Sequence, residues 1–197
     1  MNIEKTIESM EKRGFNVHYF ETAAEAAEYL RETLTGKTVG IGGSITVRDF
    51  GFYDAVKENN TTIWHFLTRD PELARKAYGA PVYISGANAI AESGEIVNVD
   101  GTGNRVAATL YNKEKVYIIS GTNKICPTHE DAMKRAREVA SPLNAKRFNT
   151  KTPCAADGKC HDCNSPERIC NMQVSILGRP NGVKELEVIL VNQDMGF

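Results

Sequence analysis

The chain has 197 residues, of which 41% are hydrophobic and 25% charged, as in an ordinary globular domain. It has 24 Lys and Arg residues and 25 Asp and Glu residues, which gives a formal net charge of −1. Nucleic-acid partners and polybasic membrane attachment both favour a basic excess, so this balance argues against them. No apolar run approaches the roughly 20 residues of a membrane span, and the N-terminal segment lacks the apolar stretch of a signal peptide. We therefore expect a cytoplasmic protein.

The first half of the chain is predicted to alternate helices with strands. Residues 3–10 carry apolar side chains at helical spacing. Thr22 and Glu25 have the spacing of a capping box, which predicts an Ala-rich helix ending near Leu34. The sequence Asp70-Pro71-Glu72 predicts another helix start. Strands are predicted over residues 15–20, 37–41, 62–66 and 82–85.

The second half predicts further strands and helices around a cysteine-rich segment. Residues 95–100 alternate in polarity between glycines, which predicts one arm of a hairpin. Helices are predicted over residues 105–111 and 128–140, and strands over 115–120, 173–177 and 185–191, with a turn over 179–182. The prediction is one α/β domain over residues 1–197, with a mainly parallel sheet flanked by helices. Residues 150–171 would form a Cys-rich insertion before the last strands.

A glycine-rich loop after the strand at 37–41 is the first candidate binding site. Gly42, Gly43, Ser44 and Thr46 follow this strand and precede a helical segment. Glycines allow a close backbone approach, and amides at the start of a helix can bind phosphate or carboxylate. The sequence is neither a dinucleotide fingerprint nor a P-loop. A tight turn capped by Ser44 or Thr46 accounts for the pattern equally well.

Three later loops place polar side chains after predicted strands. Asn88 and Glu92 lie in a loop of small residues, Asn104 and Arg105 follow a Gly-Thr-Gly sequence, and Lys124 follows the strand at 115–120. Ligands of open α/β sheets bind at the carboxyl edge of the strands. These residues are therefore candidate anion ligands, and Glu92 is a candidate catalytic carboxylate. Solvated surface positions remain the alternative for each of them.

Four of the five cysteines lie within 17 residues, at positions 154, 160, 163 and 170. In a reducing compartment, such clustered thiols bind metal more often than they form disulfides. Cys154, Cys160, Cys163 and Cys170 can therefore ligate one centre, either zinc or an iron–sulfur cluster. Free or redox-paired cysteines are the alternative. Cys126 stands apart and suits a small buried position.

The order of the loop motifs resembles that of lactate-utilization (LUD) domain proteins. The segments that carry the resemblance are 42–46, 88–94, 100–105 and 121–125, and they span most of the chain. The run Asp162-Cys163-Asn164-Ser165-Pro166-Glu167-Arg168-Ile169-Cys170 is similar to that of small stand-alone members from anaerobic bacteria. The resemblance implies a fold related to sugar-phosphate isomerases and CoA transferases.

The resemblance also implies a role beside iron–sulfur proteins, because the family is linked to the complex that oxidises lactate to pyruvate. An iron–sulfur cluster, of the 4Fe–4S type, is then favoured over zinc at the four cysteines. The implied partners are a small anionic ligand and iron–sulfur or flavin subunits. The sequence leaves homo-oligomerisation open.

Three functions fit the sequence at this stage. The first is an accessory protein for the oxidation of lactate or a similar small acid. The second is a free-standing transferase or isomerase acting on a phosphorylated or CoA-linked metabolite. In that case Glu92 would be the base or nucleophile, since Glu92-Ser93-Gly94 is similar to the glutamate turn of CoA transferases, although Ser93 departs from their asparagine. The third is a non-catalytic, metal-stabilised binding or scaffold protein.

Overall fold

The computed structural model describes residues 1–66, 68 and 70–197. Its strands are β1 (Asn16–Phe20), β2 (Thr38–Ile41), β3 (Thr61–Trp64), β4 (Val82–Gly86), β5 (Ala89–Ala91), β6 (Ile96–Asp100), β7 (Tyr111–Gly121), β8 (Ile125–Cys126), β9 (Met172–Ile176) and β10 (Gly182–Val191). Its α-helices are α1 (Ile3–Lys12), α2 (Ala23–Thr33), α3 (Ile45–Asp49), α4 (Phe52–Lys57), α5 (Pro71–Gly79), α6 (Asn104–Leu110), α7 (His129–Arg135), α8 (Ser141–Phe148) and α9 (Pro153–Asp157). A 3₁₀ turn, η1 (Thr122–Lys124), and a π-helical segment, η2 (Ala136–Ala140), complete the set.

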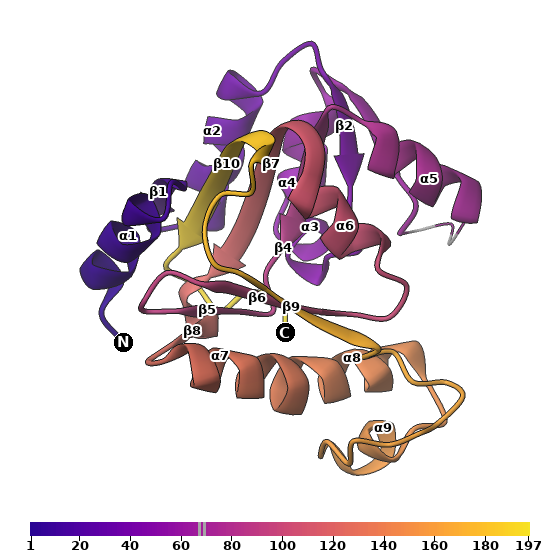
Figure 1. Cartoon of the computed structure of the whole chain (residues 1–197). Helices are drawn as coiled ribbons and strands as arrows, with labels where there is room; N and C mark the ends of the chain where they lie inside the picture. The colour runs from indigo at the N-terminus through magenta and orange to yellow at the C-terminus, as the bar shows by residue number, and fades with distance from the viewer. Residues whose placement is uncertain (67, 69) are drawn as a thin grey trace.

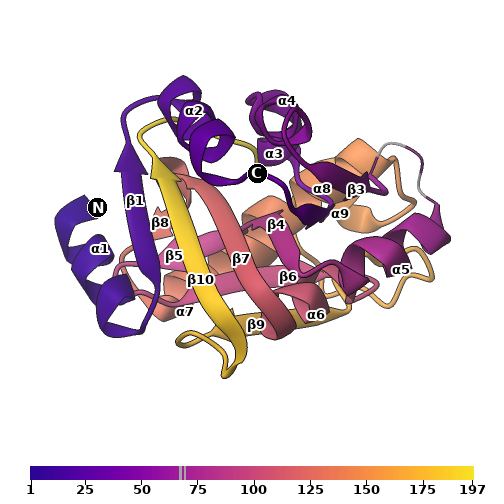
Figure 2. The same ribbon diagram turned by 90° about the horizontal axis from the view of Figure 1, so that it is seen from above.

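A six-stranded sheet forms the centre of the molecule, in the order β1-β10-β7-β4-β2-β3 (Figure 2). Each of its strand pairs is parallel. This arrangement confirms the predicted α/β fold with a mainly parallel sheet flanked by helices. The parallel register places the carboxyl ends of all six strands at one edge.

Both faces of this sheet are buried, which explains the apolar runs in its strands. On β7, Tyr117 and Ile119 face a core formed with α2, α3 and α4. Val116 and Ile118 face the opposite core, which contains side chains of α1, α5 and α6. Successive residues of a strand point to opposite faces, so one continuous apolar run serves both cores.

A second, four-stranded sheet was not predicted from the sequence. Its order is β8-β5-β6-β9, and β5 and β6 pair antiparallel, which confirms that residues 95–100 form a hairpin arm. The strands predicted on either side of the turn at 179–182 exist as β9 and β10, but they belong to different sheets. The small sheet packs between the large sheet and the long helical stretch from α7 to α8 (Figure 1).

The helix predicted over 128–140 continues through η2 to Phe148. Pro142 lacks the N–H of a regular helix, and a proline in this position commonly marks a helix start. Here the π-helical segment η2 ends two residues before the proline, and the Ser141 hydroxyl donates to the Ala136 carbonyl at 2.8 Å. The chain therefore stays helical across the proline. In the described part of the chain, no helix combines the length and apolar character needed to cross a bilayer.

Replacing Gly40 with alanine should destabilise the protein by about 2–3 kcal/mol, because the new methyl group has no space. A Cβ at Gly40 would lie 2.1 Å from the Ala77 carbonyl oxygen of α5 and 2.9 Å from Cδ2 of Tyr83. Gly79→Ala is the matched control, since no atom lies within 4 Å of a Cβ there. Urea unfolding measures both variants, and equal stabilities would contradict the close packing of α5 on β2.

Candidate functional site

A cavity of about 1480 Å³ opens at the carboxyl edge of the large sheet. Strands β2, β4 and β7 are neighbours in that sheet, so the loops that follow them converge there. The lining includes Ser44 after β2, Asn88 after β4 and Lys124 after β7. This is the position at which open α/β sheets bind ligands.

The cavity gathers most of the ligand residues predicted from the sequence. Those that line it are Gly43, Ser44, Thr46, Asn88, Asn104, Arg105 and Lys124. Gly42 instead packs beneath the loop. A Cβ at Gly42 would lie 2.9 Å from the Tyr83 hydroxyl and 3.1 Å from Cγ of Arg105, and its carbonyl accepts a hydrogen bond from Nε1 of Trp64 at 3.1 Å. Glycine at this position therefore allows the close packing against Tyr83 and Arg105.

Ser44 caps a helix and also lies at the cavity. Its hydroxyl accepts a hydrogen bond from the backbone N–H of Val47 at 3.2 Å and so caps the five-residue helix α3. It also lines the cavity. A Cβ at Gly86 would lie 2.9 Å from Oγ of Ser44, so β4 can approach this loop closely only with glycine there.

Lys124 is the most deeply buried basic residue of the cavity lining, with 3% of its surface exposed. Its Nζ donates to Oγ1 of Thr46 at 3.2 Å and to the Ala87 carbonyl at 3.1 Å. Burial, together with the nearby charges of Arg135 and Arg105, lowers the pKa of Lys124 to about 7. At neutral pH a large fraction of this lysine is therefore the uncharged amine.

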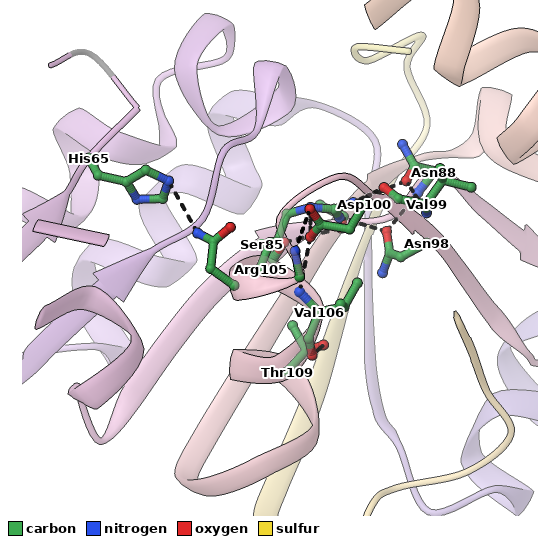
Figure 3. A network of polar contacts seen from close by, with 12 residues as sticks. His65, Ser85, Asn88, Asn98, Val99, Asp100, Arg105, Val106 and Thr109 are labelled. Atoms are coloured by element: carbon green, nitrogen blue, oxygen red, sulfur yellow. Dashed lines mark hydrogen bonds and ion pairs between the residues drawn. The ribbon is translucent and has the colours of Figure 1, made fainter. Parts of the chain in front are cut away.

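Arg105 is the centre of a polar network that holds the surrounding loops together (Figure 3). Its Nη1 donates to Oδ1 of Asn98 at 2.7 Å and to the Gly86 carbonyl at 3.2 Å. Its Nη2 donates to the Val99 carbonyl at 2.7 Å and to Oδ1 of Asn88 at 3.2 Å. Most of the guanidinium N–H groups thus bond to the protein itself, so Arg105 shapes the cavity more than it clamps a ligand.

His65 also lines the cavity, and it is not among the candidate ligand residues selected from the sequence. Its Nε2 lies 3.4 Å from Nδ2 of Asn104 (Figure 3). Nδ1 is buried with no hydrogen-bond partner among the described residues. Burial lowers the pKa of His65, and the Asp100 carboxylate partly opposes this effect. Strand β3 ends at Trp64, so His65 is the first residue beyond its carboxyl end.

Arg147 of α8 reaches the cavity from the second half of the chain. Its guanidinium carbon lies 5.1 Å from the ring centre of Phe66 and 3.9 Å from that of Phe148. Its Nε and Nη2 donate to Oδ1 of Asn144 at 2.9 and 2.7 Å. Nothing in the local sequence around Arg147 marks it as a site residue, because only the fold brings α8 to this edge.

The charged side chains of the lining are predominantly cationic. They are Arg48, Arg75, Arg105, Lys124 and Arg147 on the basic side, and Asp70 and Asp100 on the acidic side. Asparagines and histidine add neutral hydrogen-bonding groups. A concave site of this composition favours an anionic ligand that also carries hydrogen-bonding oxygens.

The structure does not bring Glu92 to this cavity. Its Oε1 accepts a hydrogen bond from the backbone N–H of Asn2 at 2.8 Å, and its Oε2 pairs with Nζ of Lys5 at 3.4 Å. The Asn2 hydrogen bond lowers the pKa of the carboxyl group. Glu92 therefore fastens α1 to the end of β5, and the geometry gives no support to a catalytic role.

The four clustered cysteines border one small hollow beside α8. Cys154, Cys160, Cys163 and Cys170 line a space of about 10 Å³. Their residues are partly buried, and the thiols are free of disulfides. Within residues 1–66, 68 and 70–197, no three His, Cys, Asp or Glu side chains are already arranged as a metal site. Binding of one metal centre by all four cysteines would require their thiols to move closer together around the hollow.

Two arginines organise this cysteine segment. Arg168 donates to the Cys163 carbonyl at 2.7 Å and to the Cys170 carbonyl at 3.1 Å. Arg137 of η2 pairs with Asp162 at 2.5 Å, and contact with Cys160 raises the pKa of this arginine. Both arginines also pair with Asp162, so they place positive charge beside the cysteine segment.

The family of this protein follows from its sequence over residues 3–191, which match the model of the LUD domain family. The chain belongs to the LUD domain family. The match covers both sheets, all of the cavity lining except Phe197, and the cysteine segment. At the family level, this associates the LUD-domain chain with lactate utilization.

A solved structure has the same fold as this LUD-domain chain. It is described as the crystal structure of a DUF162 family protein from Deinococcus radiodurans. The TM-score is 0.54 at 10% sequence identity, over 96% of this chain and 95% of that chain. No curated protein matches the sequence.

Proposed function

We propose that this LUD-domain protein binds a small organic acid in the cavity and carries a metal centre at the four cysteines. It would act as an accessory protein in the iron–sulfur-dependent oxidation of lactate or a similar acid. The supporting observation is the basic, hydrogen-bonding cavity at the carboxyl edge of the sheet, in one chain with a cluster of four thiols.

A hydroxy or oxo acid matches the groups of this cavity. Its carboxylate can pair with an arginine held in place, and Arg147 is fixed by two aromatic rings and by Asn144. Its hydroxyl or carbonyl oxygen can hydrogen-bond to Asn104 or His65. The position of Glu92 away from the cavity removes the main support for a CoA transferase that would use this carboxylate.

The cysteine segment has the donor set of a four-thiolate metal centre. All four thiols border the same hollow, and tetrahedral sulfur coordination suits zinc or iron–sulfur clusters. We favour a 4Fe–4S cluster because of the family's association with lactate utilization. Such a cluster would supply one-electron transfer, and Arg137 and Arg168 would offset part of the thiolate charge.

Replacing Arg147 with methionine should weaken the binding of lactate and pyruvate about tenfold or more, because a charge-assisted hydrogen bond is lost. Isothermal titration calorimetry at fixed ionic strength measures this change. Arg31→Met is the matched control, since Arg31 lies on α2 and pairs with Glu58 away from the cavity. Equal affinities of both variants, or no binding to the unmodified protein, would contradict the proposed ligand site.

The accessory role has its own test. Affinity purification from cells grown on lactate should recover iron–sulfur or flavin proteins with this chain, and deletion of its gene should slow growth on lactate. Recovery of no such partner, with normal growth on lactate, would contradict the role even if the cavity binds small acids.

A further inference from the structure

The amine of Lys124 has two hydrogen-bond acceptors, which is the number that its uncharged form needs. Its Nζ has two acceptors, Oγ1 of Thr46 and the carbonyl of Ala87. A neutral amine has two N–H groups and one lone pair, so these two acceptors can take both N–H groups. The lone pair is then left for a ligand, and the side chain lines the cavity.

The surroundings of Lys124 favour this uncharged form. The residue is 97% buried, and the charged groups that face it are the guanidinium groups of Arg105 on α6 and Arg135 on α7. Among the described residues, the charged groups that shift the pKa of Lys124 are these two arginines and no carboxylate. Structural buried lysines ordinarily pair with a carboxylate, whereas lysines of low pKa beside other cations serve as nucleophiles toward carbonyl groups.

We propose that Lys124 forms a Schiff base with the carbonyl carbon of a 2-oxo acid bound in the cavity. This inference rests on the proposed function and deepens it, because it selects the oxo acid and names the group that meets its carbonyl. The carboxylate of the ligand would lie against the arginines of the lining.

The step balances without any further reactant. The lone pair of Nζ attacks the carbonyl carbon, and a proton moves from nitrogen to oxygen to give a carbinolamine. The hydroxyl group then leaves as water while the nitrogen lone pair forms the C=N bond. One water is released for each imine, and no atom is oxidised or reduced. Burial of Nζ limits the water that would reverse the step.

The test is reductive trapping with pyruvate as the probe. The full-length protein is incubated with pyruvate and sodium borohydride, and its peptides are mapped by mass spectrometry. We expect a mass increase equal to pyruvic acid less one oxygen atom, located on Lys124. The trapping rate should rise as pH increases through about 7, because the reactive species is the free amine of Lys124.

Lys113 provides an internal control in the same chain. It is 4% exposed and donates to the carbonyls of Tyr78 and Asn112, and burial lowers its pKa as well. It does not line the cavity, so it should not be modified. Lys124→Arg and Lys124→Met should abolish the adduct, while Lys113→Arg should retain it.

Lactate separates this inference from the proposed function, because lactate has no carbonyl group that can form an imine. Calorimetric binding of lactate and pyruvate without a pyruvate adduct on Lys124 would overturn the Schiff base and leave the binding site intact. An adduct on Lys113 or on exposed lysines alone would also overturn it. Absence of both binding and adduct would overturn the inference together with the proposed function. Because peptide mapping uses the unmodified chain, it tests the Schiff base even if a Lys124 variant fails to fold.

Discussion

The Cys163→Ser variant should lack the bound metal that the unmodified protein retains when both are purified without oxygen. Cys163 borders the hollow shared with Cys154, Cys160 and Cys170, so the change removes one of the four proposed thiol ligands. Iron, sulfide and zinc analysis, with visible absorption, measures the effect. We expect iron and sulfide in the unmodified protein and a nearly complete loss of both in the variant.

The α/β core should remain folded in this variant. The two principal apolar clusters are formed by the sheets and by helices α1 to α6, and no cysteine of the segment belongs to them. Metal-binding free energy would stabilise the segment locally, as in other small metal-binding units. Circular dichroism should therefore show an unchanged core transition, and global unfolding would contradict the division between core and insertion.

Cys126→Ser is the matched control for the metal assignment. Cys126 is buried against α7 and does not border the hollow, so its replacement should leave the metal content unchanged. Stoichiometric zinc without visible absorption would rule out the iron–sulfur cluster. The absence of any metal from the unmodified protein would contradict the ligand assignment itself.

Local signals in the sequence predict most of the large sheet and its helices. The capping box of Thr22 and Glu25 is present, and Asp70 caps the helix that begins at Pro71. These features depend on contacts within a few residues, so the sequence alone suffices for them. The convergence of Ser44, Asn88 and Lys124 follows as well, because parallel strands share a carboxyl edge.

Features that depend on distant contacts are the ones the sequence does not predict. Strand β9 pairs with β6 in the small sheet and does not join the large sheet. No local sequence feature of either strand predicts this pairing. Glu92 lies after a predicted strand, yet its neighbours are the residues of the N-terminus. Gly42 has the pattern of an anion-binding loop, but contacts with Tyr83 and Arg105 decide its role.

Removal of the Arg105 side chain by Arg105→Met should cost about 3–5 kcal/mol of unfolding free energy, as expected when one partner of a buried network is deleted. Only 13% of this side chain is exposed. The carbonyls of Gly86 and Val99 would each lose a charged donor, and so would the side-chain oxygens of two asparagines. Urea denaturation followed by circular dichroism measures the loss.

Arg75→Met is the matched control, because Arg75 also lines the cavity but is mostly exposed and pairs with Glu72 on the surface of α5. Such exposed pairs contribute little to stability. Both variants remove one positive charge from the cavity, so a difference in stability between them isolates the network of Arg105. If the two variants were equally stable and Arg105→Met alone abolished lactate binding, the guanidinium would be a ligand clamp. The loops after β4 and β6 would then have to be held together by their own backbone bonds, such as that from Asn88 N–H to the Val97 carbonyl at 3.1 Å.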